Sequence, residues 1–349
     1  MTSAAESSAG RPAGRPVLRV EGLDVDIRTP AGTVRAVDAV GFEARAGRTL
    51  ALLGESGCGK SMTAKAIAGL LDPVAHVAGG SAELEGADLV RMPPRQRRKV
   101  AGAGLGIVFQ DALTALNPVY PVGVQLGEAF RIHHGASAAA ARQEAVKLMR
   151  RVGIPEPESR VNAYPHQFSG GMRQRILIAM AVALSPRLLI ADEPTTALDV
   201  TVQAQIMDLL RRLREEEDMA VVLITHDLAV VAEEADDVVV MYAGTVAEQG
   251  PVGQVFASPR HPYTKGLLES VPVAAERGSS LASIPGSPPE LKNIPAGCVY
   301  QDRCPLAQAV CRQERPVLRE VAPGQRAACH FSDSVPAVPA ASTLEEIQP

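Results

Sequence analysis

The sequence has no tryptophan, and aromatic residues make up only 3% of its 349 positions. Proteins that bind single-stranded nucleic acid stack the bases on aromatic side chains, so this composition disfavours that class of function. The net charge of −4 provides no overall basic field for a nucleic-acid backbone. Nucleic acid is therefore not an expected partner of this chain.

Long apolar runs are also missing. The longest, residues 176–184, has about half of the roughly 18 apolar residues that a membrane-spanning helix needs. Residues 1–16 contain no apolar segment of the kind found in signal peptides, and we expect them to form a disordered tail. These features predict a cytosolic protein, in which disulfides would be rare.

An apolar strand at residues 49–53 leads into the sequence G-E-S-G-C-G-K-S at residues 54–61. In such a phosphate loop the glycines let backbone N–H groups turn toward phosphate oxygens, while the lysine supplies a positive charge and the serine an Mg²⁺ ligand. The helix expected over residues 60–70 would add its positive N-terminal end. Strand, loop and helix occur in the required order, so the stretch predicts a nucleotide-binding site around Lys60 and Ser61.

Two later stretches could supply an Mg²⁺ ligand, an acid that acts on water, and a second anion site. An apolar strand at residues 187–191 delivers Asp192 and Glu193 to one edge of a sheet. Asp192 would hold Mg²⁺, and Glu193 would orient or deprotonate an attacking water. The helix expected over residues 169–184 begins with Ser-Gly-Gly, in which the serine can cap the helix and the glycines permit close backbone approach. Its start is a candidate second anion site.

The order of elements predicts an α/β fold. Strands that alternate with helices after residue 187 imply a parallel sheet core, and the strands at residues 17–25 and 34–44 suggest an antiparallel β subdomain. Residues 111–184 carry helical signals only, so they are expected to form an inserted helical subdomain. The predicted divisions are a main domain at 17–273, a linker and cysteine module at 274–331, and a disordered tail at 332–349.

Six motifs resemble, in order and approximate spacing, those of ATP-binding-cassette (ABC) ATPases. They are the Walker A (54–61), Q-loop (Gln110), signature (169–175), Walker B (188–193), D-loop (197–199) and switch-histidine (His226) motifs. The resemblance implies a phosphate-loop ABC nucleotide-binding domain that hydrolyses ATP with Mg²⁺.

The resemblance also implies a role for each matching residue. ATP would be bound by Gly54, Glu55, Ser56, Gly57, Cys58, Gly59, Lys60, Ser61 and Met62, with Cys58 as a small filler rather than a ligand. Mg²⁺ would be held or sensed by Ser61, Gln110 and Asp192, and the catalytic residues would be Glu193, His226 and Gln110. Ser169, Gly170, Gly171 and Met172 would cap the γ-phosphate of a nucleotide held by a partner subunit, and Asp199 would communicate across the dimer.

Further stretches resemble the ATPase subunits of bacterial dipeptide and oligopeptide importers. They are residues 109–111, 116–118, 164–167, 193–201, 261–264 and 284–286, followed by the cysteine module. This implies a peripheral subunit at the cytoplasmic face of the cell membrane. Its partners would be permease subunits, a second ATPase subunit and, indirectly, an extracytoplasmic peptide-binding protein. An importer of the same subfamily for nickel or a small glycoside is an alternative.

Two alternatives from other classes fit the sequence less well. A soluble ABC ATPase acting on DNA or ribosomes would need long coiled-coil heptads or a second cassette, and the sequence has neither. A small-molecule kinase would not need the signature or His226. Relative to the family, Ile27 stands where an aromatic side chain usually stacks on adenine, and Met172 stands where many cassettes have glutamine.

Four of the five cysteines follow the pattern C-x5-C-x6-C-x17-C, at Cys298, Cys304, Cys311 and Cys329. Four cysteines so close together in a cytosolic protein suggest metal ligation more than disulfides. The spacing matches neither the usual zinc ribbon nor a standard ferredoxin run, so it does not identify the metal. Resemblance to the C-terminal region of peptide-importer ATPases implies a [4Fe–4S] cluster, with Zn²⁺ and free structural thiols as alternatives.

Overall fold

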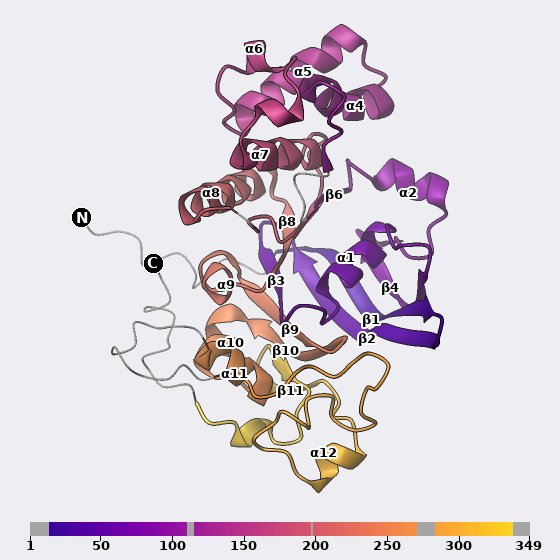
Figure 1. Cartoon of the computed structure of the whole chain (residues 1–349), viewed down its shortest axis with the longest axis vertical. Helices are drawn as coiled ribbons and strands as arrows, with labels where there is room; N and C mark the ends of the chain where they lie inside the picture. Colours follow the sequence, from indigo (N-terminus) through magenta and orange to yellow (C-terminus); the bar gives the residue numbers. More distant parts are fainter. Residues whose placement is uncertain (1–13, 110–114, 197, 271–282, 338–349) are drawn as a thin grey trace, which may run out of the picture.

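The computed structural model describes residues 14–109, 115–196, 198–270 and 283–337. The molecule is elongated, with a helical subdomain at one end, two sheets in the middle and the C-terminal segment at the other end (Figure 1). The parts of the predicted tails at residues 1–13 and 338–349 lie outside the described residues. Within the described residues, no helix combines the length and the apolar character that crossing a bilayer requires.

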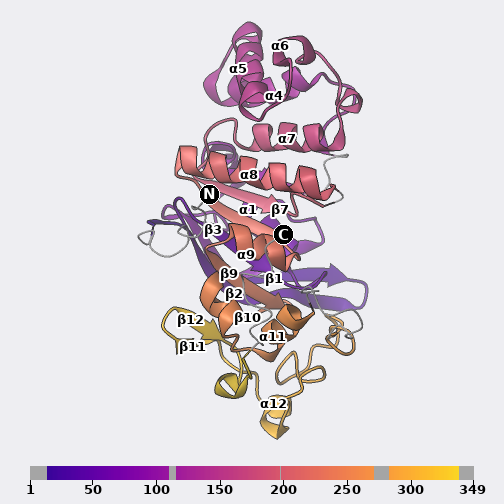
Figure 2. The ribbon, with the colours of Figure 1, turned by 90° about the vertical axis from the view of Figure 1, so that its left-hand side faces the viewer.

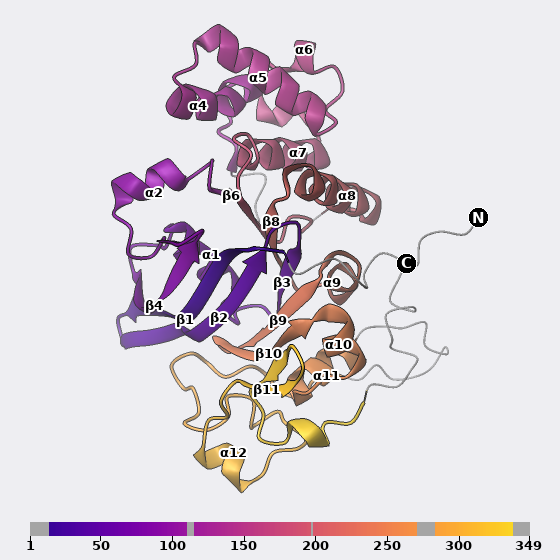
Figure 3. The ribbon, with the colours of Figure 1, turned by 180° about the vertical axis from the view of Figure 1, so that it is seen from behind.

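The N-terminal part forms a four-stranded antiparallel sheet, as the two early strand patterns predict. Its strands are β1 (Pro16–Thr29), β2 (Gly32–Arg45), β4 (Ala75–Leu84) and β5 (Ala87–Asp88), in the order β2-β1-β4-β5. Strand β4 pairs with β1 along its whole length, from Ala75 opposite Ile27 to Leu84 opposite Leu18. The sheet packs beside the core sheet (Figure 3).

The core sheet has eight strands, in the order β11-β12-β10-β9-β3-β8-β7-β6. The parallel strands are β3 (Thr49–Leu53), β6 (Leu105–Val108), β7 (Leu188–Asp192), β8 (Ala220–Thr225) and β9 (Asp237–Tyr242). The antiparallel strands are β10 (Thr245–Pro251), β11 (Arg319–Ala322) and β12 (Gln325–Ala327). The sheet is therefore mixed: five parallel strands agree with the expected core, and three antiparallel strands extend its edge.

The described helices outside the helical subdomain are α1 (Lys60–Ala68), α2 (Pro94–Val100), α8 (Val200–Glu217), α9 (Leu228–Glu234), α10 (Val252–Ala257), α11 (Pro262–Glu269) and α12 (Ala309–Gln313). Both ends of helix α8 are set by local interactions. Asp199 caps its first turn by accepting a hydrogen bond from the Val202 N–H, and Asp218 ends it in the left-handed conformation.

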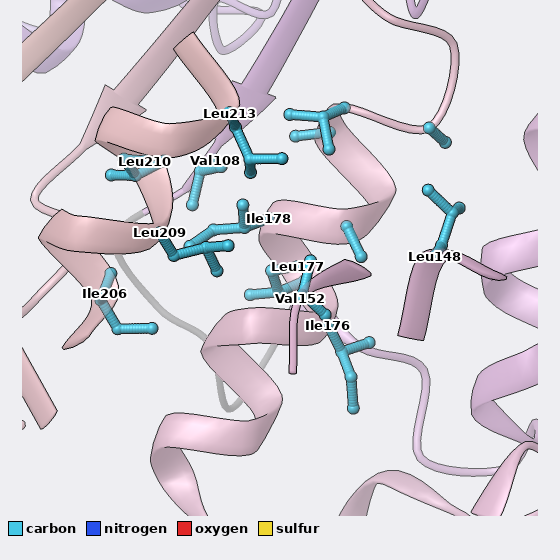
Figure 4. Packing of buried hydrophobic residues seen from close by; sticks show 14 of the residues in the cluster. Val108, Leu148, Val152, Ile176, Leu177, Ile178, Ile206, Leu209, Leu210 and Leu213 are labelled. Atoms are coloured by element: carbon cyan, nitrogen blue, oxygen red, sulfur yellow. The ribbon is translucent and has the colours of Figure 1, made fainter. Parts of the chain in front are cut away.

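The helical subdomain contains α4 (Val122–His134), α5 (Ala138–Arg151), α6 (Pro157–Arg160), the short 3-10 helix η1 (Pro165–Gln167) and α7 (Gly170–Ala181). Helix α7 is buried on several sides, so it has almost no amphipathic pattern. It packs toward α5 through Ile176 and Leu148, and toward α8 through Ile178 and Leu209 (Figure 4). One continuous core thus joins the inserted helices to the sheet, which fixes the start of α7 relative to it.

The expected cysteine module is part of the cassette's own structure. Its strand β12 pairs with β10 and its strand β11 pairs with β12, at the far edge of the core sheet (Figure 2). Its residues Cys298, Tyr300 and Cys311 are buried in the same cluster as Leu53 and Val240 of the central strands. A 3-10 turn at Ser332–Ser334 (η2) continues ordered structure into the predicted C-terminal tail. The segment therefore uses the core of the cassette rather than one of its own.

Glu248 on β10 is a buried carboxylate at this junction. It is 0% exposed and accepts hydrogen bonds from the backbone N–H groups of Arg260 and His261 and from the Gln325 side chain on β12. Burial raises its pKa from 4.5 to about 7, more than these donors lower it. The junction between β10, β12 and α11 therefore centres on one acid that carries a charge only near or above neutral pH.

This predicts a pH-dependent stability difference between the wild type and Glu248→Gln. Between pH 4.5 and about 7 the folded protein keeps a proton that the unfolded chain has released, so Glu248 destabilises the fold as pH rises through this window. Over the window the wild type should lose up to about 3 kcal/mol relative to the variant. Chemical denaturation of both proteins at several pH values measures this. A difference in the free energy of unfolding that stays constant with pH would contradict this prediction.

Candidate functional site

The phosphate loop connects the end of β3 to the start of α1. Gly54, Gly57 and Gly59 all have positive φ angles, a backbone conformation that residues with a side chain rarely adopt. A Cβ atom at Gly54 would also collide with the carbonyl oxygen of Met241. Since Lys60 is the first residue of α1, the lysine stands at the positive end of the helix.

The Lys60 side chain binds the backbone at the start of the phosphate loop. Its ammonium donates to the carbonyl oxygens of Gly54 and Glu55, at 2.7 and 3.1 Å, and its side chain is buried. Cys58 is buried beside it, with Sγ 3.7 Å from the lysine nitrogen, and burial raises the pKa of this thiol. The neutral, packed Cys58 agrees with the role of a small filler.

Ser61 and Asp192 meet across the sheet. The Ser61 hydroxyl donates to Asp192 Oδ1 at 2.9 Å, although 131 positions separate the two residues in the sequence. Asp192 ends β7 and is buried, and this burial raises its pKa even though the Ser61 hydrogen bond opposes the shift. A hydroxyl and a carboxylate side by side are the oxygen ligands that Mg²⁺ prefers, so this pair could hold the metal of a bound nucleotide.

Glu193 and His226 form the next pair, at the ends of the neighbouring strands β7 and β8. His226 Nδ1 lies 3.2 Å from Glu193 Oε1, and the Thr196 hydroxyl donates to Glu193 Oε2 at 2.8 Å. Partial burial would raise the pKa of Glu193, but the hydrogen bonds from Thr196 and His226 outweigh it and the pKa is lowered. Glu193 also has a φ of 47°, an uncommon conformation for a residue with a side chain.

The signature lies apart from these groups. Ser169 caps α7 by accepting a hydrogen bond from the Met172 N–H, and Gly170 and Gly171 face Leu198 and Val202 beside the D-loop. A Cβ at Gly171 would lie 2.7 Å from a Val202 methyl carbon, which explains the glycine. Within the described part of the chain, no hydrogen bond joins residues 169–172 to the phosphate loop. Within one chain, the predicted signature residues and the predicted phosphate-loop residues therefore form two separate groups.

Other predicted site residues have mixed outcomes. Asp199 caps α8 by accepting a hydrogen bond from the Val202 N–H. Ile27 is half-buried on β1, where it pairs with Val34 and Ala75 rather than presenting an aromatic ring. Gln110 lies outside the described residues.

Two residues that contact the loop were missed by the sequence analysis. The Tyr263 hydroxyl accepts a hydrogen bond from the Glu55 N–H at 2.9 Å, and Arg303 forms an ion pair with the Glu55 carboxylate. Tyr263 belongs to the His-Pro-Tyr-Thr stretch, in which His261 caps α11 and buries its ring. That stretch was a usable signal for Tyr263, whereas nothing in the sequence around Arg303 points to a residue 248 positions away.

The four C-terminal cysteines are free thiols in one segment. The Cys298 N–H donates to the Cys311 carbonyl oxygen at 2.8 Å, and burial raises the pKa values of Cys304 and Cys329 to about 11. Proximity to the other cysteines contributes to the shifts at both residues. Among the residues that the structure describes, however, no three cysteine, histidine or acidic side chains converge as a metal site. The thiols are gathered but not arranged for ligation.

Known proteins share these features. The ABC transporter family matches residues 37–196, and the family described as oligopeptide/dipeptide transporter, C-terminal region, matches residues 247–311. The dipeptide transport ATP-binding protein DppD of Escherichia coli is 48% identical over 315 residues, which cover 90% of this chain and 96% of that protein. DppD of Bacillus subtilis is 51% identical, covering 86% and 90%. The oligopeptide transport ATP-binding protein OppD of Salmonella typhimurium is 48% identical, covering 90% and 93%.

A solved structure is similar over the cassette. It is a dimeric, post-hydrolysis state of the ATP-binding cassette MJ0796 bound to ADP and Pi, with a TM-score of 0.60 and 26% sequence identity. The match covers 67% of this chain and 98% of that one. The cassette fold is therefore shared.

The geometry at Glu193 predicts the effect of Glu193→Gln. An amide cannot accept a proton from water, so ATP hydrolysis should fall by roughly 10² to 10⁴ fold. ATP binding should persist, because Lys60, Ser61 and Asp192 are unchanged. Steady-state hydrolysis and equilibrium nucleotide binding measure the two effects. The exposed Glu83→Gln on β4 is the control and should behave as wild type. Hydrolysis by Glu193→Gln at the wild-type rate would remove Glu193 from the catalytic role.

Proposed function

Because this chain belongs to the family of ATP-binding subunits of dipeptide and oligopeptide ABC transporters, we propose that it hydrolyses ATP to power peptide uptake through a membrane permease. The observation that carries the proposal is the convergence of Lys60, the Ser61–Asp192 pair and the Glu193–His226 pair. All stand at the ends of the neighbouring strands β3, β7 and β8. This arrangement supports in-line attack of water on a terminal phosphate.

Each residue then has a role in that attack. Lys60 offers its charge to the phosphate oxygens, and Ser61 and Asp192 are placed to hold Mg²⁺, which would neutralise charge on the phosphates. Glu193 has a lowered pKa, so it is a carboxylate at neutral pH and can orient water or accept its proton. His226 contacts Glu193 and, since its side chain is 64% exposed, remains accessible to a terminal phosphate.

We propose that the complete site forms between two subunits. The signature residues at the start of α7 are separated from the phosphate loop of their own chain, and each motif occurs once in the sequence. A similar cassette has been solved as a dimer with ADP and Pi, which supports a second ATPase subunit as partner. The permease, an extracytoplasmic peptide-binding protein and a place at the cytoplasmic face of the membrane follow from the importer role.

Peptides are the favoured cargo over nickel or a small glycoside. The three relatives described above are named for dipeptide or oligopeptide transport, and each is at least 48% identical to this chain. The match to the C-terminal region of peptide transporters points the same way.

We also propose that Cys298, Cys304, Cys311 and Cys329 hold one [4Fe–4S] cluster, with Zn²⁺ as the alternative. Four thiols in one short segment are a suitable donor set for such a cluster. Ligation would have to draw the thiols together and deprotonate them, against the raised pKa values of Cys298, Cys304 and Cys329. Metal binding would therefore be coupled to pH and to ordering of the segment.

The shared-site proposal predicts a dependence on assembly. The isolated subunit should hydrolyse ATP slowly, because it lacks the signature of a partner at the γ-phosphate. Reconstitution with the permease and the second ATPase should raise the rate by roughly 10² fold, the typical cost of one missing transition-state donor. Rates per site, measured with and without peptide-loaded binding protein, provide the test. A fully active monomer that does not respond to peptide would contradict the importer role.

The cluster proposal predicts a coloured protein. Anaerobically purified protein should be brown and carry near-stoichiometric iron and sulfide, and Cys311→Ser should lose both while retaining nucleotide binding at Lys60. The control is Cys58→Ser, which should keep its iron. Colourless protein with one zinc per chain would indicate the alternative metal. Metal-free protein with four alkylatable thiols and an ordered segment would exclude a metal site.

A further inference from the structure

Arg303 in the cysteine-containing segment reaches the phosphate loop. Its Nη1 donates to Glu55 Oε2 at 2.7 Å and its Nη2 to Glu55 Oε1 at 3.0 Å. The guanidinium and the carboxylate thus form a two-pronged pair, the strongest geometry available to these groups. The Arg303 side chain is only 5% exposed, so solvent screens the pair less than it screens a surface ion pair.

The surroundings of Arg303 hold it in this orientation. Its Nε donates to the Pro285 carbonyl oxygen at 2.8 Å, and its Nη1 also donates to the Tyr242 hydroxyl at 3.3 Å. The guanidinium carbon lies 5.7 Å from the centre of the Tyr242 ring, within the range of a cation–π contact. Arg303 is therefore a fixed donor directed at the loop.

Glu55 is the loop residue on which these contacts converge. Its N–H donates to the Tyr263 hydroxyl, and its carbonyl oxygen accepts from the Lys60 ammonium. The carboxylate, the amide and the carbonyl of one residue are therefore bound by Arg303, Tyr263 and Lys60 respectively. A change at Arg303 can reach the lysine through a single residue.

The charge of Glu55 explains why such a contact is needed. A carboxylate on a loop that binds a triphosphate repels the ligand unless a cation neutralises it. Arg303 supplies that cation from outside the loop, which leaves the Lys60 charge for the phosphates. We propose that Arg303 is a positioning residue for ATP hydrolysis: it neutralises Glu55 and fixes the loop around Lys60. This inference rests on the proposed function, since it assigns a role in ATP binding.

A second ion pair provides a matched comparison. Arg315, from the same C-terminal segment, pairs with Asp38 on β2, and neither of these two side chains has a hydrogen bond to residues 54–61 among the described contacts. Both pairs tie the segment to the cassette, but only the pair of Arg303 touches the nucleotide site. Loss of Arg315 therefore reports the effect of weakening the attachment alone.

The experiment compares ATP hydrolysis by the full-length chain in its complex with permease and partner ATPase. Arg303→Gln should raise the KM for ATP about tenfold and change kcat by less than about twofold, because it leaves an unneutralised carboxylate beside the ligand. Glu55→Gln/Arg303→Gln removes that carboxylate too and should restore most of the affinity. Arg303→Lys keeps the charge but not the two-pronged geometry, so its KM should be intermediate. Arg315→Gln should keep the wild-type KM.

Several results would overturn the proposal. A wild-type KM in Arg303→Gln is one, and equal losses in Arg303→Gln and the double variant are another. Equal losses of affinity and thermal stability in Arg303→Gln and Arg315→Gln would show an effect of attachment only. If Arg303→Gln does not fold, Arg303→Lys decides: a raised KM supports the role and an unchanged KM overturns it. An inactive wild-type complex would overturn the proposed function as well, whereas an active one confines any failure to Arg303.

Discussion

The parallel pairing of β3 with β8 and of β8 with β7 is the constraint on which the site depends. The carboxyl ends of adjacent parallel strands lie at one edge of a sheet, so whatever follows them is brought together. Lys60 and Ser61 follow β3, Asp192 and Glu193 stand at the end of β7, and His226 follows β8. Their separation along the sequence is therefore irrelevant to their separation in space.

Two neighbouring carboxylates at this edge have opposite properties. Asp192 is buried and its pKa is raised, whereas the pKa of Glu193 is lowered by hydrogen bonds from Thr196 and His226. Asp192 would gain most from a cation that compensates its burial, which suits a metal ligand. Glu193 is already stabilised as an anion by its hydrogen bonds, which suits a carboxylate that stays charged and orients a water molecule. Environment, rather than residue type, thus separates the two roles.

The sequence predicts a feature of this structure well when its signals are local, and poorly when it depends on contacts between distant segments. Elements with local signals were predicted close to their observed residues: β3 covers the predicted residues 49–53, and α7 begins directly after its predicted cap Ser169. Strand β12 has only three residues and exists because β10 is beside it, so no periodicity could reveal it. The motif residues of the site were named in advance because their spacing is characteristic. The Arg303–Glu55 pair was not, because it depends on how two distant segments pack.

The central strand β3 lies between the N-terminal core and the C-terminal core. Successive side chains of a strand point to opposite faces of the sheet. Accordingly, Leu50 and Leu52 of β3 pack into the core of the antiparallel sheet and α1, and Ala51 and Leu53 into the core that contains Cys298 and Tyr300. The phosphate loop therefore extends from a strand held between the N-terminal and C-terminal cores. Because interiors are close-packed and transmit strain, a rearrangement of the C-terminal segment would reach the loop through β3 as well as through Arg303. The C-terminal segment and the phosphate loop are thus both anchored to β3, although different family matches cover them.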